Sequence, residues 1–72
     1  MNKAVIWFAV LVLQIPLEYW KNASEYERDL TRHTATMDYL SNPTFKGKSF
    51  RIWEEIKDGN WQLHVEEMKV VI

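Results

Sequence analysis

The chain has 72 residues, no cysteine and a formal net charge of −1, with acidic and basic residues mixed along its length. This size allows one domain at most, the lack of cysteine excludes disulfides and the usual Cys/His zinc sites, and the balanced charge argues against a nucleic-acid partner. A domain this small is marginally stable on an ordinary core, so a partner chain, a membrane or an unusually efficient core is expected to support it.

The first element is an apolar segment over residues 1–15, in which the Trp7 indole is the only polar side-chain group between Ala4 and Leu13. As a membrane helix this run is shorter than the ~20 residues that cross a bilayer. It would have to extend over residues 4–20, with aromatic side chains at its end as interfacial anchors. A membrane helix of marginal length is therefore one interpretation of this segment.

The same segment is rich in Val, Ile and aromatic residues, so it is also suited to a central β-strand with both faces covered. Such a strand would need a homodimer or another protein on its second face, because one helix covers one face only. A cleaved signal peptide is a third interpretation, but Trp7 and Phe8 lie inside the apolar core and no small-residue cleavage site follows closely. The segment is predicted to be a retained membrane helix or a central strand.

A long amphipathic helix is predicted from about Pro16 to Ser41. Proline suits the first helical turn, and Pro43 ends the helix because it disfavours helical geometry in the residue before it. His33 is expected to be buried, neutral and hydrogen-bonded rather than a ligand or a switch. It belongs to an apolar stripe, spaced by three and four, that should pack on the protein's own sheet: Tyr19, Ala23, Tyr26, Leu30, His33, Met37 and Leu40.

A C-terminal antiparallel β-hairpin is predicted because Asp58-Gly59 lies between two alternating runs and suits a type I′ turn. Folding the strands about this turn gives one largely apolar face and one face with an aromatic and a charged pair. The predicted opposite residues are Ile56 and Trp61, Glu54 and Leu63, and Ile52 and Val65 on the first face, and Glu55 and Gln62, Trp53 and His64, and Arg51 and Glu66 on the second.

Beyond Glu66-Glu67 the apolar positions switch from odd to even numbers, which predicts a β-bulge at these glutamates. The apolar C-terminal residues then need a neighbour, either the N-terminal segment as a strand or a partner protein that adds a strand. The candidate partner-binding residues are Trp53, His64, Val70 and Ile72.

The basic loop around Gly47 is a weak candidate for an anion or a lipid headgroup, because a glycine can expose backbone N–H groups beside positive side chains. Its residues are Lys46, Lys48 and Arg51. No phosphate-binding motif accompanies them, so an ordinary solvated connection is the alternative interpretation.

No residues form a catalytic constellation. The paired glutamates of the hairpin alternate between its faces, which indicates a role in structure and solubility rather than acid-base chemistry. The glycosylation sequon at Asn22 lies inside the predicted helix and is interpreted as a chance match. We therefore expect no enzymatic activity, no cofactor, no metal and no small-molecule substrate.

The predicted fold class is α+β, with segment 1–15 preceding a helix-hairpin unit of residues 16–72 that forms a single domain. The first functional hypothesis is a membrane-associated accessory or inhibitory subunit, anchored by its N-terminal segment, that docks on a larger protein through the helix-hairpin unit. The alternative is a soluble, cytoplasmic βαββ binding module or inhibitor, for example of phage or plasmid type, that acts as a dimer or docks on a target protein.

Overall fold

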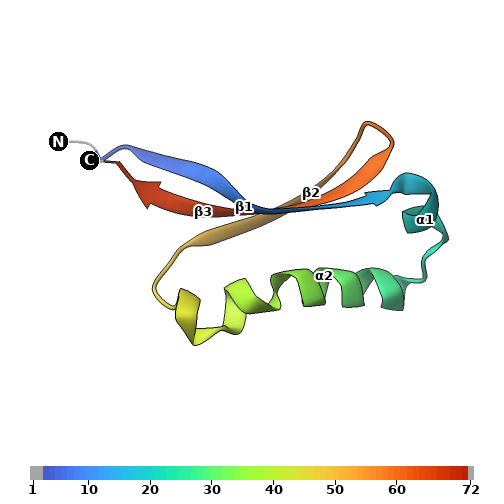
Figure 1. Cartoon of the computed structure of the whole chain (residues 1–72), viewed down its shortest axis with the longest axis horizontal. Helices are drawn as coiled ribbons and strands as arrows, with labels where there is room; N and C mark the ends of the chain where they lie inside the picture. Colours follow the sequence, from blue (N-terminus) through green and yellow to red (C-terminus); the bar gives the residue numbers. More distant parts are fainter. Residues whose placement is uncertain (1–2, 72) are drawn as a thin grey trace.

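The computed structural model describes residues 3–71 and confirms the α+β class (Figure 1). The elements in chain order are strand β1 (Val5–Pro16), the short helix α1 (Leu17–Asn22), the long helix α2 (Glu25–Ser41), a single 3-10 turn η1 (Pro43–Phe45) and the hairpin of β2 (Phe50–Lys57) and β3 (Asn60–Val70). The strands form one antiparallel sheet in the order β1-β3-β2. Helix α2 runs along one face of this sheet (Figure 1).

The N-terminal apolar segment is a β-strand, so the membrane-helix interpretation is wrong. Residues Val5–Pro16 pair with β3 along their whole length. Among residues 3–71, no helix has the length and apolar character needed to cross a bilayer. The strand interpretation is confirmed, although the middle position of the sheet belongs to β3 and β1 lies beside it. The apolar C-terminal end of the hairpin finds its predicted neighbour here, since Val5 lies opposite Val70.

The predicted register of the hairpin is confirmed at every pair. Ile56 lies opposite Trp61 on one face, and Trp53 lies opposite His64 on the other. At the turn, Asp58 has a φ of 53° and Gly59 a φ of 75°. Two successive positive values are the signature of a type I′ turn, whose twist matches that of the strands it joins.

Replacing Gly59 with Val is expected to lower the free energy of unfolding by about 1–2 kcal/mol, because a β-branched residue is strained in the left-handed backbone region. A Cβ at this position would meet no atom within 4 Å, so the cost comes from the backbone alone. Gly59→Asn is the matched control, since Asn tolerates this conformation. Urea denaturation measures all three proteins, and a Val variant as stable as the parent would contradict the turn.

The β-bulge lies on β1, so its prediction at Glu66-Glu67 is wrong. The ladder between β2 and β3 runs through these residues without interruption. In the ladder between β1 and β3, the register shifts between Ala9 and Leu11, which makes Val10 the extra residue. The bulge therefore divides β1 near its midpoint and reverses the order in which its side chains alternate between the two faces.

The switch of apolar positions along β3 has a different cause. Figure 1 shows that the ends of β1 and β3 that carry the chain termini reach beyond the end of α2. The register places the side chains of Glu67 and Lys69 on the helix side of the sheet in this region, where no helix within residues 3–71 covers them. Met68 and Val70 take the other side. The apolar residues thus change face along a regular strand.

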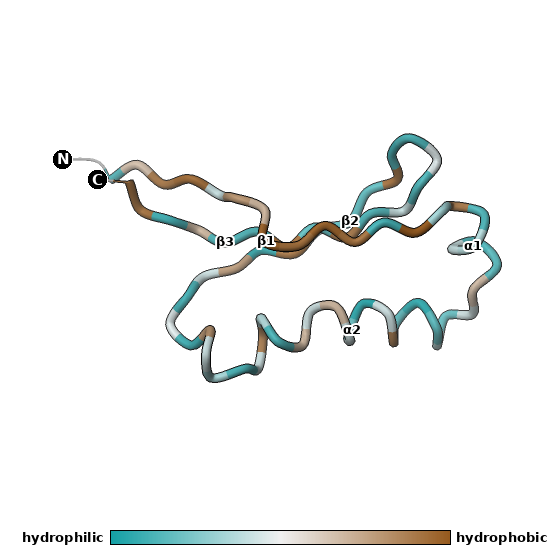
Figure 2. The backbone as a smooth tube through the Cα atoms, in the orientation of Figure 1, coloured by the Kyte–Doolittle hydropathy of each residue, from teal (hydrophilic) through white to brown (hydrophobic). Residues whose placement is uncertain are grey.

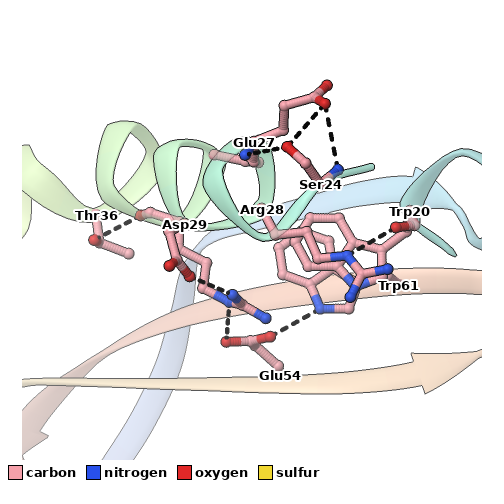
Figure 3. Close-up of polar contacts among 10 residues, drawn as sticks. Trp20, Ser24, Glu27, Arg28, Asp29, Thr36, Glu54 and Trp61 are labelled. Atoms are coloured by element: carbon pink, nitrogen blue, oxygen red, sulfur yellow. Dashed lines mark hydrogen bonds and ion pairs between the residues drawn. The ribbon is translucent and has the colours of Figure 1, made fainter. Parts of the chain in front are cut away.

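The predicted helix of residues 16–41 is broken at Ala23 and Ser24 into α1 and α2. The Ser24 hydroxyl accepts a hydrogen bond from the backbone N–H of Glu27 at 3.1 Å, and the Glu27 carboxylate accepts one from the backbone N–H of Ser24 at 3.3 Å (Figure 3). This reciprocal capping box starts a new helix. The break lets α1 direct Trp20 into the core while α2 runs along the sheet.

The apolar stripe of α2 does not pack on the sheet. Tyr26 and Leu40 are 75% and 69% exposed, and His33 is exposed as well, so the prediction of a buried His33 is wrong. The side of α2 with the least exposure is instead a row of small, amphipathic and long charged residues: Arg28, Thr31, Arg32, Ala35, Thr36 and Tyr39.

Two stacked tryptophans explain this reversal. Trp20 of α1 and Trp61 of β3 lie with ring centroids 3.6 Å apart and planes 7° apart (Figure 3). Leu63 is buried with them, and Val65 is fully buried on the same strand. The two indoles fill the space between α2 and the sheet, so the side of α2 that faces the sheet carries small side chains and the aliphatic parts of long polar ones instead of large apolar groups. The guanidinium of Arg32, for example, lies 5.1 Å from the Trp20 ring centroid.

Glu54 of β2 joins this core to α2. One carboxylate oxygen accepts a hydrogen bond from the Trp61 indole N–H at 2.9 Å, and the other accepts one from Arg32 Nε at 2.9 Å (Figure 3). Asp29 accepts a further hydrogen bond from Arg32 at 2.9 Å. The hydrogen bond to Glu54 raises the pKa of Arg32. Glu54, the polar residue on the largely apolar face of the hairpin, thus links the buried Trp61 to helix α2.

A smaller aromatic cluster fixes the other end of α2. The Tyr39 ring centroid lies 5.2 Å from that of Phe45 in η1 and 5.3 Å from that of Phe50 in β2. Phe45 and Phe50 meet edge to face with centroids 5.8 Å apart. Aromatic contacts of this geometry hold the C-terminal end of the helix against the start of the hairpin.

Candidate functional site

The face of the sheet opposite α2 has no helix over it within residues 3–71, and we call it the open face (Figure 1). Side chains alternate between the two faces of each strand, and residues directly opposite one another share a face. The registers therefore place the following residues on the open face: Val5, Trp7, Ala9, Val12 and Gln14 of β1, Arg51, Trp53 and Glu55 of β2, and Gln62, His64, Glu66, Met68 and Val70 of β3.

Trp53 and His64 form a fixed aromatic pair in the middle of the hairpin. Their ring centroids are 3.9 Å apart and their planes differ by 4°. The Trp53 indole N–H donates to a Glu66 carboxylate oxygen at 3.0 Å. His64 Nε2 lies 2.8 Å from a Glu55 carboxylate oxygen and 3.0 Å from the Gln62 side-chain oxygen. Stacking fixes one face of each ring, and polar contacts fix the ring nitrogens, so both side chains are ordered in the free protein.

Arg51 extends this arrangement across the sheet to β1. Its Nε donates to the same Glu66 oxygen, and its guanidinium lies 4.6 Å from the centroid of the Trp7 ring. The hydrogen bond from Arg51 lowers the pKa of Glu66, and the hydrogen bond from Trp53 acts in the same direction. We call Trp7, Arg51, Trp53 and His64 the aromatic ladder. The charged Glu66 carboxylate joins two of its members, because it accepts hydrogen bonds from both Arg51 and Trp53.

Amide side chains border the ladder at the hairpin end of the open face. The Gln14 side-chain oxygen accepts hydrogen bonds from the amide of Gln62 at 3.3 Å and from that of Asn60 at 3.4 Å. Val12 lies next to them on the exposed strand β1, opposite His64. A row of Val12, His64 and Trp53 therefore crosses all three strands, with acceptor groups on both sides of it.

The structure places three of the predicted partner-binding residues on this one face. Trp53 and His64 are in contact, and Val70 lies on the same face towards the chain termini. Ile72 lies outside the described residues. Sequence analysis missed Trp7, because its position on the open face depends on pairing with β3 across the bulge.

The three residues of the weak anion or lipid site are divided between two places. Lys48 Nζ lies 3.5 Å from a Glu67 carboxylate oxygen, whereas Arg51 is paired with Glu66 on the open face. Lys46 lies in the exposed loop beside Gly47. Two of the three positive charges thus have carboxylate partners, and the anion site stays a prediction.

In comparisons with protein-family models, with curated proteins and with solved structures, nothing matches this chain. Over residues 3–71, no three side chains of the His, Asp or Glu type are grouped so that they could hold a metal ion. The chemistry of the chain's own surfaces is therefore the basis for a functional assignment.

Proposed function

We propose that this chain is a non-enzymatic protein-binding module, of the accessory or inhibitor type, that docks on a larger protein through the open face. The observation that supports this proposal is the aromatic ladder. Trp and Arg are among the residues that dominate binding energy at protein interfaces. Trp53 is 38% exposed and yet fixed by its stack on His64, so little side-chain entropy is lost when a partner covers it.

The bordering groups define the chemistry of the partner. The carboxylates of Glu55 and Glu66 and the amide oxygen of Gln14 are acceptors beside apolar side chains. A complementary protein surface presents an aliphatic or aromatic side chain to the ladder and hydrogen-bond donors around it.

A protein fits this face better than a nucleic acid does. Nucleic acids are bound mainly through Lys and Arg side chains that neutralise phosphates. On the open face Arg51 is hydrogen-bonded to Glu66, and His64 lies beside Glu55. These carboxylates compensate positive charge where a phosphate would need it, whereas the exposed apolar and aromatic area remains available to a protein surface.

Trp53→Ala is expected to lower the affinity for the partner at least about 30-fold, as truncation of a central interface tryptophan does. Ile56→Ala is the matched control, because Ile56 belongs to the same strand, is 63% exposed and lies on the helix side of the sheet. Proteins retained from a lysate of the source cells by the parent chain are identified by mass spectrometry, purified, and titrated against all three chains by calorimetry.

The control should bind like the parent, and circular dichroism should show that both variants are folded. An affinity that falls equally in the two variants, or that does not change in the Trp53 variant, would rule out docking through the open face. A parent chain that retains no protein beyond those held by the Trp53 variant would also count against the proposal.

A further inference from the structure

Strand β1 is a long sheet edge without charge, and Figure 2 shows that most of its length is hydrophobic. It has 12 residues, none of them Asp, Glu, Lys or Arg, and within the described part of the chain it pairs with β3 on one side only. The other edge, β2, has 8 residues, of which Arg51, Glu54, Glu55 and Lys57 are charged. Charged side chains protect an edge from pairing, and a long uncharged edge is a template for another strand. The two edges are thus built for different surroundings.

An apolar groove runs beside this strand. It has a volume of about 590 Å³ and lies between Leu11 and Leu13 of β1 and the side of α2 that carries Leu30, Ala35 and Tyr39. Leu30 is 49% exposed at this position. Helix α2 therefore leaves the helix side of β1 incompletely covered, although the strand pairing directs apolar side chains there.

The shape of the chain indicates how much of its exposed surface a partner could cover. Its radius of gyration is 14.6 Å, whereas a compact domain of this length has about 11 Å. It exposes 5513 Å², whereas a compact monomer of its mass exposes about 4,700 Å². The excess of about 800 Å² equals what one partner buries in a protein interface of standard size.

The bulge makes β1 complementary to itself. When two β1 strands overlap antiparallel over their full length, Leu13 of one copy lies opposite Phe8 of the other, and Val12 lies opposite Ala9. In a regular strand these pairs would bring together residues from opposite faces. Across the bulge they do not, because Leu13 and Phe8 both lie on the helix side of the sheet in the ladder with β3, and Val12 and Ala9 both lie on the open face.

We propose that two copies of this chain form a dimer in which their β1 strands pair antiparallel over their full length. The two sheets join into one, and Phe8 of each copy lies beside Leu13 of the other, at the groove. The overlap ends with Val5 of each copy opposite Pro16 of the other. Lys3, two residues before Val5, and Glu18, in the first turn of α1, therefore flank the same end of the interface, and both side chains are exposed. A two-fold axis repeats this pair, so the ends of the interface are complementary in charge.

Leu30→Glu tests the groove, because it introduces a charge where the second copy would cover α2. Leu40→Glu is the matched control, since it makes the same change on an exposed position of the same helix that does not line the groove. Sedimentation equilibrium at about 100 μM, where an interface of standard size associates, should show a dimer for the parent and for the Leu40 variant and a monomer for the Leu30 variant. A monomeric parent, or a Leu30 variant that dimerises as tightly as the Leu40 variant, would overturn the proposal.

Charge reversal tests the alignment of the two strands. Lys3→Glu and Glu18→Lys should each weaken the dimer about three- to ten-fold, and the double variant should recover the affinity of the parent. No change in the single variants, or no recovery in the double variant, would rule out full overlap. These measurements use the purified chain alone, so their outcome is separate from the docking of another protein on the open face.

Discussion

Replacing Trp61 with Ala is expected to lower the free energy of unfolding by about 3–5 kcal/mol, as truncation of a buried large aromatic residue does. Trp61 is 3% exposed and stacks on Trp20, so its side chain is the contact between β3 and α1. Its removal leaves a cavity that neither helix can fill without losing its own contacts. For a domain of this size the loss is a large share of the total stability, and the variant should be largely unfolded at moderate temperature.

Trp53→Ala provides the comparison, because it removes the same side chain from the neighbouring strand on the open face. This variant lacks the stack on His64 and the hydrogen bond to Glu66, which should lower its free energy of unfolding by about 1–2 kcal/mol. Urea denaturation followed by far-ultraviolet circular dichroism measures both variants without relying on tryptophan emission. If Trp61→Ala were no less stable than Trp53→Ala, the stacked pair would not be the centre of the core.

The hairpin was predictable because its signals are local. The Asp58-Gly59 turn and the two-residue alternation on either side fix the register together. Once the register was known, the contact between Trp53 and His64 and the pairing of Arg51 with Glu66 followed directly. These are the central contacts of the open face, so three of the four residues of the aromatic ladder could be read from one continuous stretch of sequence.

The N-terminal segment gave no such local signal. A run of apolar β-branched and aromatic residues suits a strand and also suits a short membrane helix, and the difference depends on whether β3 is available as a neighbour. The position of Trp7 on the open face additionally depends on the bulge at Val10. No alternation within an all-apolar run reveals a bulge, because both faces of the strand look the same.

The stripe on α2 misled for a different reason. Apolar spacing by three and four predicts which side of a helix is buried only if the helix itself fills the space above the sheet. Here Trp20 enters that space from α1, and its stack on Trp61 displaces the stripe towards solvent. The capping box of Ser24 and Glu27 was a local sign of the break between the helices. This capping box indicates that Trp20 and His33 lie on two different helices, so the burial of Trp20 does not imply the burial of His33.

The second large effect is expected at Glu54. Glu54→Ala should lower the free energy of unfolding by about 1–3 kcal/mol, because it leaves the indole N–H of the buried Trp61 without an acceptor. The ion pair with Arg32 is a minor part of this effect, since the two side chains are 35% and 37% exposed and water screens their charges. The cost is thus attributed to an unpaired donor inside the core.

Two controls separate these contributions. Glu54→Gln keeps an acceptor for the indole and removes the charge, so it should stay within about 1 kcal/mol of the parent. In a Trp61→Phe background the donor is already absent, so Glu54→Ala should cost much less than in the parent, and the cycle gives the coupling between the two side chains. Urea denaturation of the set measures it. Equal losses of unfolding free energy for Glu54→Ala and Glu54→Gln, together with additivity in the cycle, would show that Glu54 stabilises the fold through its ion pair with Arg32 and not through its hydrogen bond with Trp61.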